Sequence, residues 1–479
     1  MSNIYKSAIH PAKYRSSFGP YYFLKNKGNI QAKPKSSGLR INQPLIILLT
    51  FTPIILAILS LFYFEEYFDA LHVARLDTGW GYWTYIISLS LLTIKLSFLG
   101  WLFHLHKKYK VIKSVSDNNL PTCTVIVPAY NEGEMVYKTL VSLAKSNYPK
   151  KKLQIISIDD GSKDDTWKWM LKAINELGER LVIYQQPKNL GKREALHRAF
   201  MVGTGDVFVT VDSDSIVKKN TLRNIVSPFV VNKSCGAVAG NVMVLNKEEG
   251  LIPKMLNVSF AFSFEFIRSA QSVLGSVLCT PGALAAYRKT AVLNCLNDWV
   301  NQEFLGNKAT IGEDRAMTNM ILKQGYEVVF QKNAKVYTNL PTGYNNLRKM
   351  FTRWERSNVR ENIMLTKFAF SDFRKGNKVG TRLLLFNQWL KVILAFPALA
   401  LLITLLIIQP LLVLSSLFVG LFIFSFIPAI FFVLNREKKE AIWAYSYAIF
   451  YTFTLFWITP FAIATAGRTG WLTRNLPMS

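Results

Sequence analysis

The chain contains few cysteines, and their positions follow no recognisable pattern. Only four occur among 479 residues, and no two are spaced as CxxC. This pattern excludes a disulfide-dense secreted fold and indicates reduced thiols in a cytosolic domain. The motifs GxGxxG and GxxxxGK[ST] are also absent, so neither a dinucleotide-binding fingerprint nor a P-loop is supported. The four cysteines are Cys123, Cys235, Cys279 and Cys295.

Acidic residues are scarce, and the net charge is +27. Binding to nucleic acid is one interpretation of such a charge, and contact with anionic lipid is another. We favour the membrane because the basic residues cluster beside apolar runs. Residues 1–40 carry Lys and Arg but no Asp or Glu, and no apolar signal-peptide core follows closely. We therefore interpret residues 1–40 as a basic cytosolic arm.

Long uncharged runs predict a first transmembrane hairpin. Residues 44–64 contain no charge, and residues 80–103 contain only Lys95, so each run is long enough to span a bilayer. Lys95 is a functional candidate inside the membrane, although a lysine this close to the end of a span can also snorkel. The connection between the runs is acidic and the flanks are basic, which places the flanks in the cytosol.

Two further runs, 383–408 and 410–434, predict a second hairpin. Residues 441–466 are also long enough to cross, but they contain Ser, Thr and Pro460. We expect this last segment to be re-entrant or interfacial and broken near Pro460, since such residues are tolerated where a segment packs on protein. The prediction is four spans in an integral plasma or inner membrane protein.

Between about 121 and 370 the sequence predicts a soluble α/β domain. Short β-branched runs alternate with helical patterns, as in a parallel sheet with crossover helices. Three polar clusters follow the ends of predicted strands, where open sheets bind ligands. The clusters are PAYNE (128–132), DDGS (159–162) and DSD (212–214).

The three clusters would bring carboxylates together at one crevice. Asp160, Asp212 and Asp214 would repel one another there without a cation. Oxygen ligands suit Mg²⁺ or Mn²⁺, with a diphosphate completing the coordination shell. The alternative is that each cluster only caps a helix.

Other charged residues extend this prediction. Lys192 and Arg193 begin a predicted helix and suit a phosphate group, although a solvated basic face has the same pattern. Glu313 and Asp314 precede another helix; they either cap it or provide a general base for a sugar hydroxyl. Residues 346–365 predict an amphipathic helix with a cationic face, lying in the membrane interface or on the protein surface.

PAYNE, DDGS, GKR, DSD, GED and RW occur here in an order and spacing that resemble membrane-embedded family 2 processive glycosyltransferases, the group of hyaluronan synthases, chitin synthases and NodC-like enzymes. The resemblance extends from the soluble domain to the C-terminus. It implies an α/β GT-A (Rossmann-like) cytosolic domain, a transmembrane helical region with amphipathic interface helices, and inverting transfer from a UDP-sugar with Mn²⁺ or Mg²⁺.

The resemblance also assigns roles to residues. Catalysis falls to Asp314 with Glu313, and metal binding to Asp214 and Asp212. Acceptor binding falls to Cys279, Gly282 and Trp354. Residues expected to bind the UDP-sugar are Ala129, Tyr130, Glu132, Asp160, Lys192, Arg193, Asp212, Arg353 and, in the WLTR element at 471–474, Arg474.

Two departures from the family pattern concern product and acceptor. The Gln of QxxRW is Met350 here, which puts processivity and donor affinity in question. Pro281 and Ala283 stand where relatives often differ, so the identity of the acceptor does not carry over.

The residue patterns and the resemblance together predict a function, its partners and an order of segments along the chain. The expected function is a membrane polysaccharide synthase that uses UDP-GlcNAc, with UDP-GlcA as a second candidate donor, and extrudes a β-linked polymer. The alternatives are a non-processive transferase acting on a membrane lipid, or a UDP-sugar sensor without catalysis. The expected partners are the donor, the growing polysaccharide and membrane lipids, not nucleic acid.

The expected boundaries are an arm at 1–40, a transmembrane hairpin at 41–106, the GT-A domain at 107–345, interface helices at 346–380, a second hairpin at 381–434 and the gating segment at 435–479.

Overall fold

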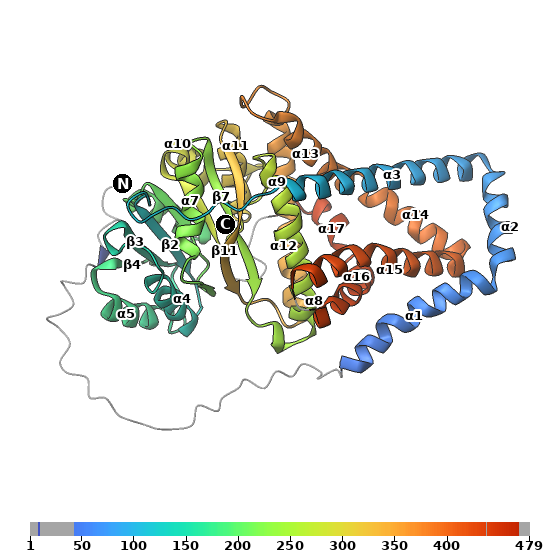
Figure 1. The fold of residues 1–479 in the computed structure, drawn as a ribbon, viewed down its shortest axis with the longest axis horizontal. Coiled ribbons are helices and arrows are strands. Elements are labelled where there is room, and N and C mark those ends of the chain that lie inside the picture. The colour runs from blue at the N-terminus through green and yellow to red at the C-terminus, as the bar shows by residue number, and fades with distance from the viewer. Residues whose placement is uncertain (1–7, 10–42, 437, 469–479) are drawn as a thin grey trace.

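The computed structural model describes residues 8–9, 43–436 and 438–468, and it consists of an α/β region and a helical region (Figure 1). Apolar strands form the centre of the α/β region; all seven residues of β2, for example, are buried. Such continuous burial is typical of strands covered by helices on both faces. The helical region projects to one side of the sheet in Figure 1.

The main sheet has nine strands in the order β1-β4-β3-β2-β5-β8-β7-β11-β6. Strands β4, β3, β2 and β5 are mutually parallel, as predicted. Beyond them the sheet is mixed rather than parallel, because β8 runs antiparallel to both β5 and β7. The strands are β1 (Ala8–Ile9), β2 (Cys123–Ala129), β3 (Leu153–Asp159), β4 (Leu181–Gln185), β5 (Val207–Thr210), β6 (Ser215–Val217), β7 (Cys235–Val244), β8 (Ala285–Arg288) and β11 (Glu327–Thr338), with a separate hairpin of β9 (Glu303–Phe304) and β10 (Asn307–Lys308).

Helices alternate with these strands and position the polar loops at their ends. Helices α8 and α9 are joined by a π-helical segment, Ala261–Ile267. The helices of this region are α4 (Glu134–Ala144), α5 (Thr166–Leu177), α6 (Lys192–Val202), α7 (Thr221–Val231), α8 (Leu251–Phe260), α9 (Arg268–Val273), α10 (Lys289–Val300) and α11 (Glu313–Lys323).

The first two apolar runs form α1 (Gln43–Tyr63) and α3 (Gly79–Lys108). The acidic connection between them is not a loop but a helix, α2 (Glu65–Leu76). Two glutamates in its first turn and an arginine in its last turn complement the helix dipole, which explains why this polar segment is helical.

The C-terminal apolar runs form bent helices. Helices α13 (Lys378–Ile393) and α14 (Ala395–Ile408) form a pair with a bend of 43° between them. Helix α15 (Pro410–Asn435) follows. The last run bends by 46° between α16 (Trp443–Thr454) and α17 (Ile458–Ala464), just before Pro460. Within the described residues, three helices are long and apolar enough to cross a membrane, or up to five if each bent pair is one span.

Helix α12 (Tyr344–Ala369) forms the predicted amphipathic helix. Leu347 and Met350 of its apolar face are buried and Trp354 is exposed, and part of its cationic face is buried as well. Arg360 is paired with Glu361 and bonds the carbonyl of Ile311, and Arg356 donates to Thr465 Oγ1 at 3.0 Å. Packing against α11, α13 and α17 therefore replaces the lipid or solvent that the pattern alone suggested.

A buried ion pair joins the helical region to the sheet. Glu265, in the π-helical segment, lies 2.5 Å from Arg436, which directly follows α15. Lys332 lies 3.7 Å away and Asn241 donates to the same carboxylate at 3.0 Å. Each partner comes from a different part of the chain, so this contact fixes the end of α15 against strands β7 and β11.

Candidate active site

The predicted crevice forms where β2 and β3 end. Ala129 is paired with Asp159 across these parallel strands, and the Asp160 amide donates to the Ala129 carbonyl at 2.8 Å. A cavity of about 500 Å³ opens beside them, lined by Tyr130, residues 161–163 and residues 185–189. This volume and the polar lining suit a nucleoside.

Two residues expected to bind the donor also hold the loops around this cavity. The Asp160 carboxylate accepts hydrogen bonds from the amides of Leu190 and Gly191, at 2.8 and 2.9 Å. Asp160 therefore positions the turn that starts α6. The Glu132 amide donates to Thr166 Oγ1 at 2.8 Å, which ties the PAYNE loop to α5.

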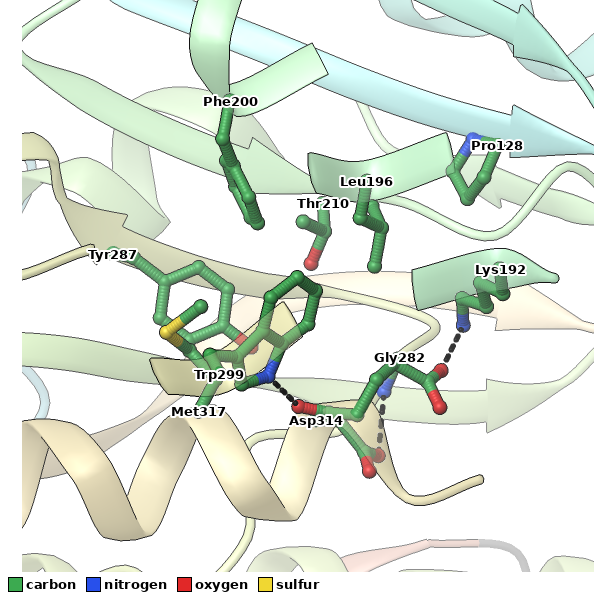
Figure 2. A pocket seen from close by; sticks show the side chains of 11 residues that line it. Pro128, Lys192, Leu196, Phe200, Thr210, Gly282, Tyr287, Trp299, Asp314 and Met317 are labelled. Carbon is green, nitrogen blue, oxygen red and sulfur yellow. Dashed lines mark hydrogen bonds and ion pairs between the residues drawn. The ribbon is translucent and has the colours of Figure 1, made fainter. Parts of the chain in front are cut away.

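Lys192 lies at the centre of the charged part of the site (Figure 2). It is the first residue of α6, and its Nζ lies 2.6 Å from Asp212 Oδ1 and 3.0 Å from Glu313 Oε1. Burial opposes its charge, but the carboxylates of Asp212 and Glu313 outweigh burial and raise the pKa of Lys192. Lys192 is therefore a fixed cation between the DSD and GED motifs.

Glu313 and Asp314 start α11 and have opposite electrostatic environments. Glu313 is buried, yet Lys192 more than offsets that burial and lowers the pKa of its carboxyl. Asp314 accepts from the Gly282 amide at 3.2 Å and from Cys279 Sγ at 3.8 Å. Burial and the neighbouring charge of Glu313 raise the pKa of Asp314, as a proton acceptor requires.

A small cavity lies beside these carboxylates. Its volume is about 10 Å³, enough for about one water molecule, and its mainly apolar lining comes from β2, β5, β8, α6, α10, α11 and the loop that contains Gly282. Figure 2 shows Trp299 and Tyr287 to the left of Gly282 and Asp314. The Trp299 indole donates to the Glu313 carbonyl at 2.8 Å and so holds the start of α11. The charged groups therefore act in a site with little bulk water behind them.

Asp212 and Asp214 are the two carboxylates that the sequence predicts to bind a metal ion. Burial and the charge of Asp212 raise the pKa of Asp214, which accepts hydrogen bonds from Ser215 and Thr338 at 3.1 Å. In the part of the chain that the structure describes, no group of three or more His, Cys, Asp or Glu side chains could hold a metal ion. Two carboxylates that repel each other do fit a cation whose remaining ligands are substrate phosphates.

Four predicted residues remain, namely Trp354, Arg353, Arg193 and Arg474. Trp354 is 38% exposed and packs on Phe260, with ring centroids 6.2 Å apart. Burial raises the pKa of Glu313, but the positive charges of Lys192 and, to a smaller extent, Arg353 outweigh burial and lower that pKa. Arg193, in contrast, turns away from the crevice and donates to the Trp299 carbonyl at 2.5 Å. Arg474 lies outside the described residues.

Sequence reasoning missed Thr338 and Trp299. Thr338 is the last residue of β11 and reaches Asp214 from 124 positions away. Trp299 lies in α10 and supports Glu313 through its ring nitrogen. Neither belongs to a short motif, so only the folded sheet reveals their relation to the site.

Comparisons with known proteins show what part of the chain resembles. Residues 124–295 match the family described as Glycosyl transferase family 2. The hyaluronan synthase of Streptococcus pyogenes is 31% identical over 252 residues, which cover 52% of this chain and 59% of that protein. An N-acetylglucosaminyltransferase of Rhizobium meliloti is 30% identical over 251 residues, 52% of this chain and 58% of that one. The chain therefore spans less than two thirds of the length of these relatives.

A solved structure confirms the fold class. The mannosyltransferase PcManGT of Pyrobaculum calidifontis, in complex with GDP-Man and Mn²⁺, has a TM-score of 0.50 and 18% sequence identity. The similarity covers 78% of this chain and 96% of that one. The predicted α/β domain of GT-A type with an additional helical region is therefore confirmed.

Proposed function

We propose that this chain, whose residues 124–295 form a family 2 glycosyltransferase domain, transfers sugar from a UDP-sugar to a growing β-linked polymer and extrudes that polymer across a membrane. The observation that carries the proposal is the position of Asp314. Its carboxylate has a raised pKa, lies at hydrogen-bond distance from the Gly282 amide, and neighbours the Lys192–Asp212 pair. UDP-GlcNAc is the first donor to test and UDP-GlcA the second, because the named relatives are a hyaluronan synthase and an N-acetylglucosaminyltransferase.

The proposed reaction is a direct displacement. The acceptor hydroxyl attacks the anomeric carbon of the donor, the bond from that carbon to the diphosphate breaks, and UDP leaves. Asp314 accepts the proton of the attacking hydroxyl. Lys192, whose Nζ lies 2.6 Å from Asp212 Oδ1, would stabilise the negative charge that develops on the leaving diphosphate. Attack opposite the leaving group inverts the anomeric centre, so an α-linked donor gives a β-linked product.

Asp212 and Asp214 would hold a Mn²⁺ or Mg²⁺ ion together with the diphosphate oxygens. When bound, the ion supplies positive charge that offsets the charge of the diphosphate. Ser215 and Thr338 keep the Asp214 carboxylate oriented by donating to one of its oxygens. Tyr130 and the loops around the 500 Å³ cavity would surround the uridine.

The proposed membrane arrangement follows from charge and packing. Basic flanks of the first apolar helices favour a cytosolic catalytic domain in a multi-pass protein. Trp354 is exposed and belongs to α12, which Figure 1 shows between the α/β region and the apolar helices. Its ring face would suit a sugar at the entrance to a path across the membrane. A polymer that passed along this path would leave the membrane on the side opposite the cytosolic donor site.

The test is the Asp314→Asn variant of the full chain in membranes, supplied with each UDP-sugar singly and in pairs. UDP release should fall by about 10³-fold or more while UDP binding stays within about twofold of the unmodified protein, since the amide keeps the shape of the side chain but cannot accept the proton. Asp298→Asn, at an exposed position of α10, is the matched control. Retained turnover in Asp314→Asn would show that Asp314 is not the base.

A second candidate function is transfer of one sugar to a membrane lipid. The apolar helices beside the site fit a lipid acceptor as well as a polymer path. Product size separates the two functions: a ladder or smear on a gel indicates polymer, and a single lipid-linked sugar excludes the synthase. Absence of UDP release with any UDP-sugar would instead favour a binding protein without catalysis.

A further inference from the structure

Three buried hydroxyl groups form a hydrogen-bonded chain that ends at Asp314. Tyr287 Oη lies 2.9 Å from Thr280 Oγ1, which lies 2.8 Å from Thr318 Oγ1. Thr318 Oγ1 in turn donates to the Asp314 carbonyl at 2.8 Å. Thr280 and Thr318 are fully buried and Tyr287 is 3% exposed, so the chain is shielded from bulk water. We call Tyr287, Thr280 and Thr318 the hydroxyl chain.

The direction of each hydrogen bond follows from the number of protons available. Thr318 has one hydroxyl proton and donates it to the carbonyl four residues earlier, a common bond of threonine in helices. Thr318 Oγ1 must therefore accept from the Thr280 hydroxyl, and it also accepts from the Thr280 amide at 3.1 Å. These three bonds use the one proton and both lone pairs of the Thr318 oxygen. Tyr287 must then donate to Thr280, and burial, which raises the pKa of Tyr287, keeps the phenol protonated.

The hydroxyl chain joins the proposed base to the segment that contains Gly282. Thr280 lies two residues before Gly282 in the loop that leads to β8. The Gly282 amide donates to the Asp314 carboxylate at 3.2 Å, as Figure 2 shows. Thr318 meanwhile links Thr280 to the carbonyl of Asp314, so this one segment holds both ends of the base. A shift of Thr280 therefore changes the distance between the Gly282 amide and the carboxylate.

The geometry of the hydroxyl chain suits positioning and not proton transfer. Its last acceptor is the Asp314 carbonyl, which does not ionise, so a proton taken up by the carboxylate cannot leave along it. Packing alone does not require it either, because apolar groups of the same shape in place of two paired polar groups are nearly neutral for stability. What consecutive hydroxyl groups add is a set of defined separations, since each bond polarises and strengthens the next.

We propose that Tyr287, Thr280 and Thr318 are positioning residues that hold the Asp314 carboxylate at the distance from Gly282 that sugar transfer requires. The proposal rests on the proposed function, because it takes Asp314 as the base that accepts the proton of the acceptor hydroxyl. The hydroxyl chain acts through Asp314 and the Gly282 amide rather than on the substrate itself. Such positioning matters because a displacement of about 1 Å at a reacting group can lower the rate about 100-fold.

The test uses the full chain in membranes with UDP-GlcNAc and UDP-GlcA, and it measures kcat for UDP release, KM for UDP-GlcNAc and the pH–rate profile. Thr318→Val removes the hydroxyl and keeps the branched shape of the side chain. Its kcat should fall about tenfold or more while KM stays within about twofold, because the donor cavity is not disturbed. A displaced Gly282 amide stabilises the Asp314 carboxylate less, so the acidic limb should move to higher pH. Thr318→Ser restores the hydroxyl and should restore both kcat and the position of the limb.

Two further variants and one control complete the test. Thr280→Val should match Thr318→Val, and Tyr287→Phe, which removes only the outermost bond, should lower kcat by about fivefold or less. The control is Thr124→Val, at the start of β2, because Thr124 is also fully buried and its hydroxyl donates to Gln154 at 2.7 Å. Its kcat should stay within about twofold of the unmodified protein.

The outcomes separate this proposal from the proposed function. An unshifted acidic limb in Thr318→Val overturns the positioning role, and so does a loss of kcat in Thr318→Ser as large as that in Thr318→Val. A loss in Thr124→Val as large as that in Thr280→Val overturns it as well. If Thr318→Val does not fold, Thr280→Val and Tyr287→Phe decide by the same criteria. Retained turnover in Asp314→Asn, or no UDP release by the unmodified chain, refutes the proposed function itself.

Discussion

Gly282 lies so close to Lys192 that a single methyl group tests the arrangement of the charged site. A Cβ added at Gly282 would lie 2.7 Å from Lys192 Nζ and 3.5 Å from Asp212 Oδ2. To restore ordinary contact, the amine must move by about 0.7 Å. Because the amine is the far end of a flexible side chain, it can move without disturbing the fold.

The consequence of this movement is electrostatic. The Lys192 amine lies 2.6 Å from Asp212 and 3.0 Å from Glu313, and a shift of about 0.7 Å takes at least one carboxylate out of hydrogen-bond range. One charge-assisted hydrogen bond contributes about 1.5–3 kcal/mol, so the rate of transfer in Gly282→Ala should fall about 10- to 100-fold. The melting temperature should stay within about 2 °C of the unmodified protein.

The assay is UDP release at saturating donor, together with thermal unfolding of the same samples. Gly343→Ala is the matched control, because Gly343 has extended backbone angles and no atom within 4 Å of an added Cβ. If Gly282→Ala keeps activity within about twofold of Gly343→Ala, Lys192 does not need its present position and the reasoning is refuted.

Three further predictions concern acid, metal and stability. Burial and the charge of Glu313 raise the pKa of Asp314, so acidification should protonate this base, and activity should fall, at a higher pH than for an ordinary aspartate. Glu313→Gln removes that charge and should shift the acidic limb of the pH–rate profile to lower pH. An unshifted limb contradicts the assignment of Asp314 as the base. Asp214→Ala should lower UDP affinity in Mn²⁺ but not in EDTA by titration calorimetry, and equal losses in both would argue against metal binding. Glu361 is fully buried and accepts hydrogen bonds from Gln302 and Asn319 at 2.9 Å. Glu361→Ala should therefore lower the free energy of unfolding by about 3–5 kcal/mol. A melting temperature equal to that of the control Glu303→Ala, at an exposed position, would contradict this prediction.

Local sequence patterns predicted the ends of the parallel strands well. Apolar runs followed directly by acid, such as VFVTVDSD, fix both the strand and the polar turn after it. The GED motif likewise comes directly before an amphipathic pattern, and α11 begins at Glu313 of this motif. Because these features depend on residues that are close in sequence, a local sequence pattern can predict them.

Other features depend on what packs against a residue, and no local pattern contains that information. Arg193 follows Lys192 on α6, and successive helix residues point about 100° apart, so only one of the two can face the crevice. The four-residue strand β8 is too short to show a periodic pattern or its antiparallel direction. The buried Arg360 of α12 looks like part of a solvated face until Glu361 and α11 are placed beside it.

The contact between Glu265 and Arg436 has a consequence for dissecting this chain. A soluble fragment ending before the second apolar hairpin would retain Glu265 without Arg436, leaving a carboxylate that is 3% exposed with Asn241 and a lysine 3.7 Å away. Removing one partner of a buried ion pair typically costs about 3–5 kcal/mol, a large share of the stability of an average domain. The α/β region would therefore lose much of its stability if it were separated from Arg436 at the end of α15.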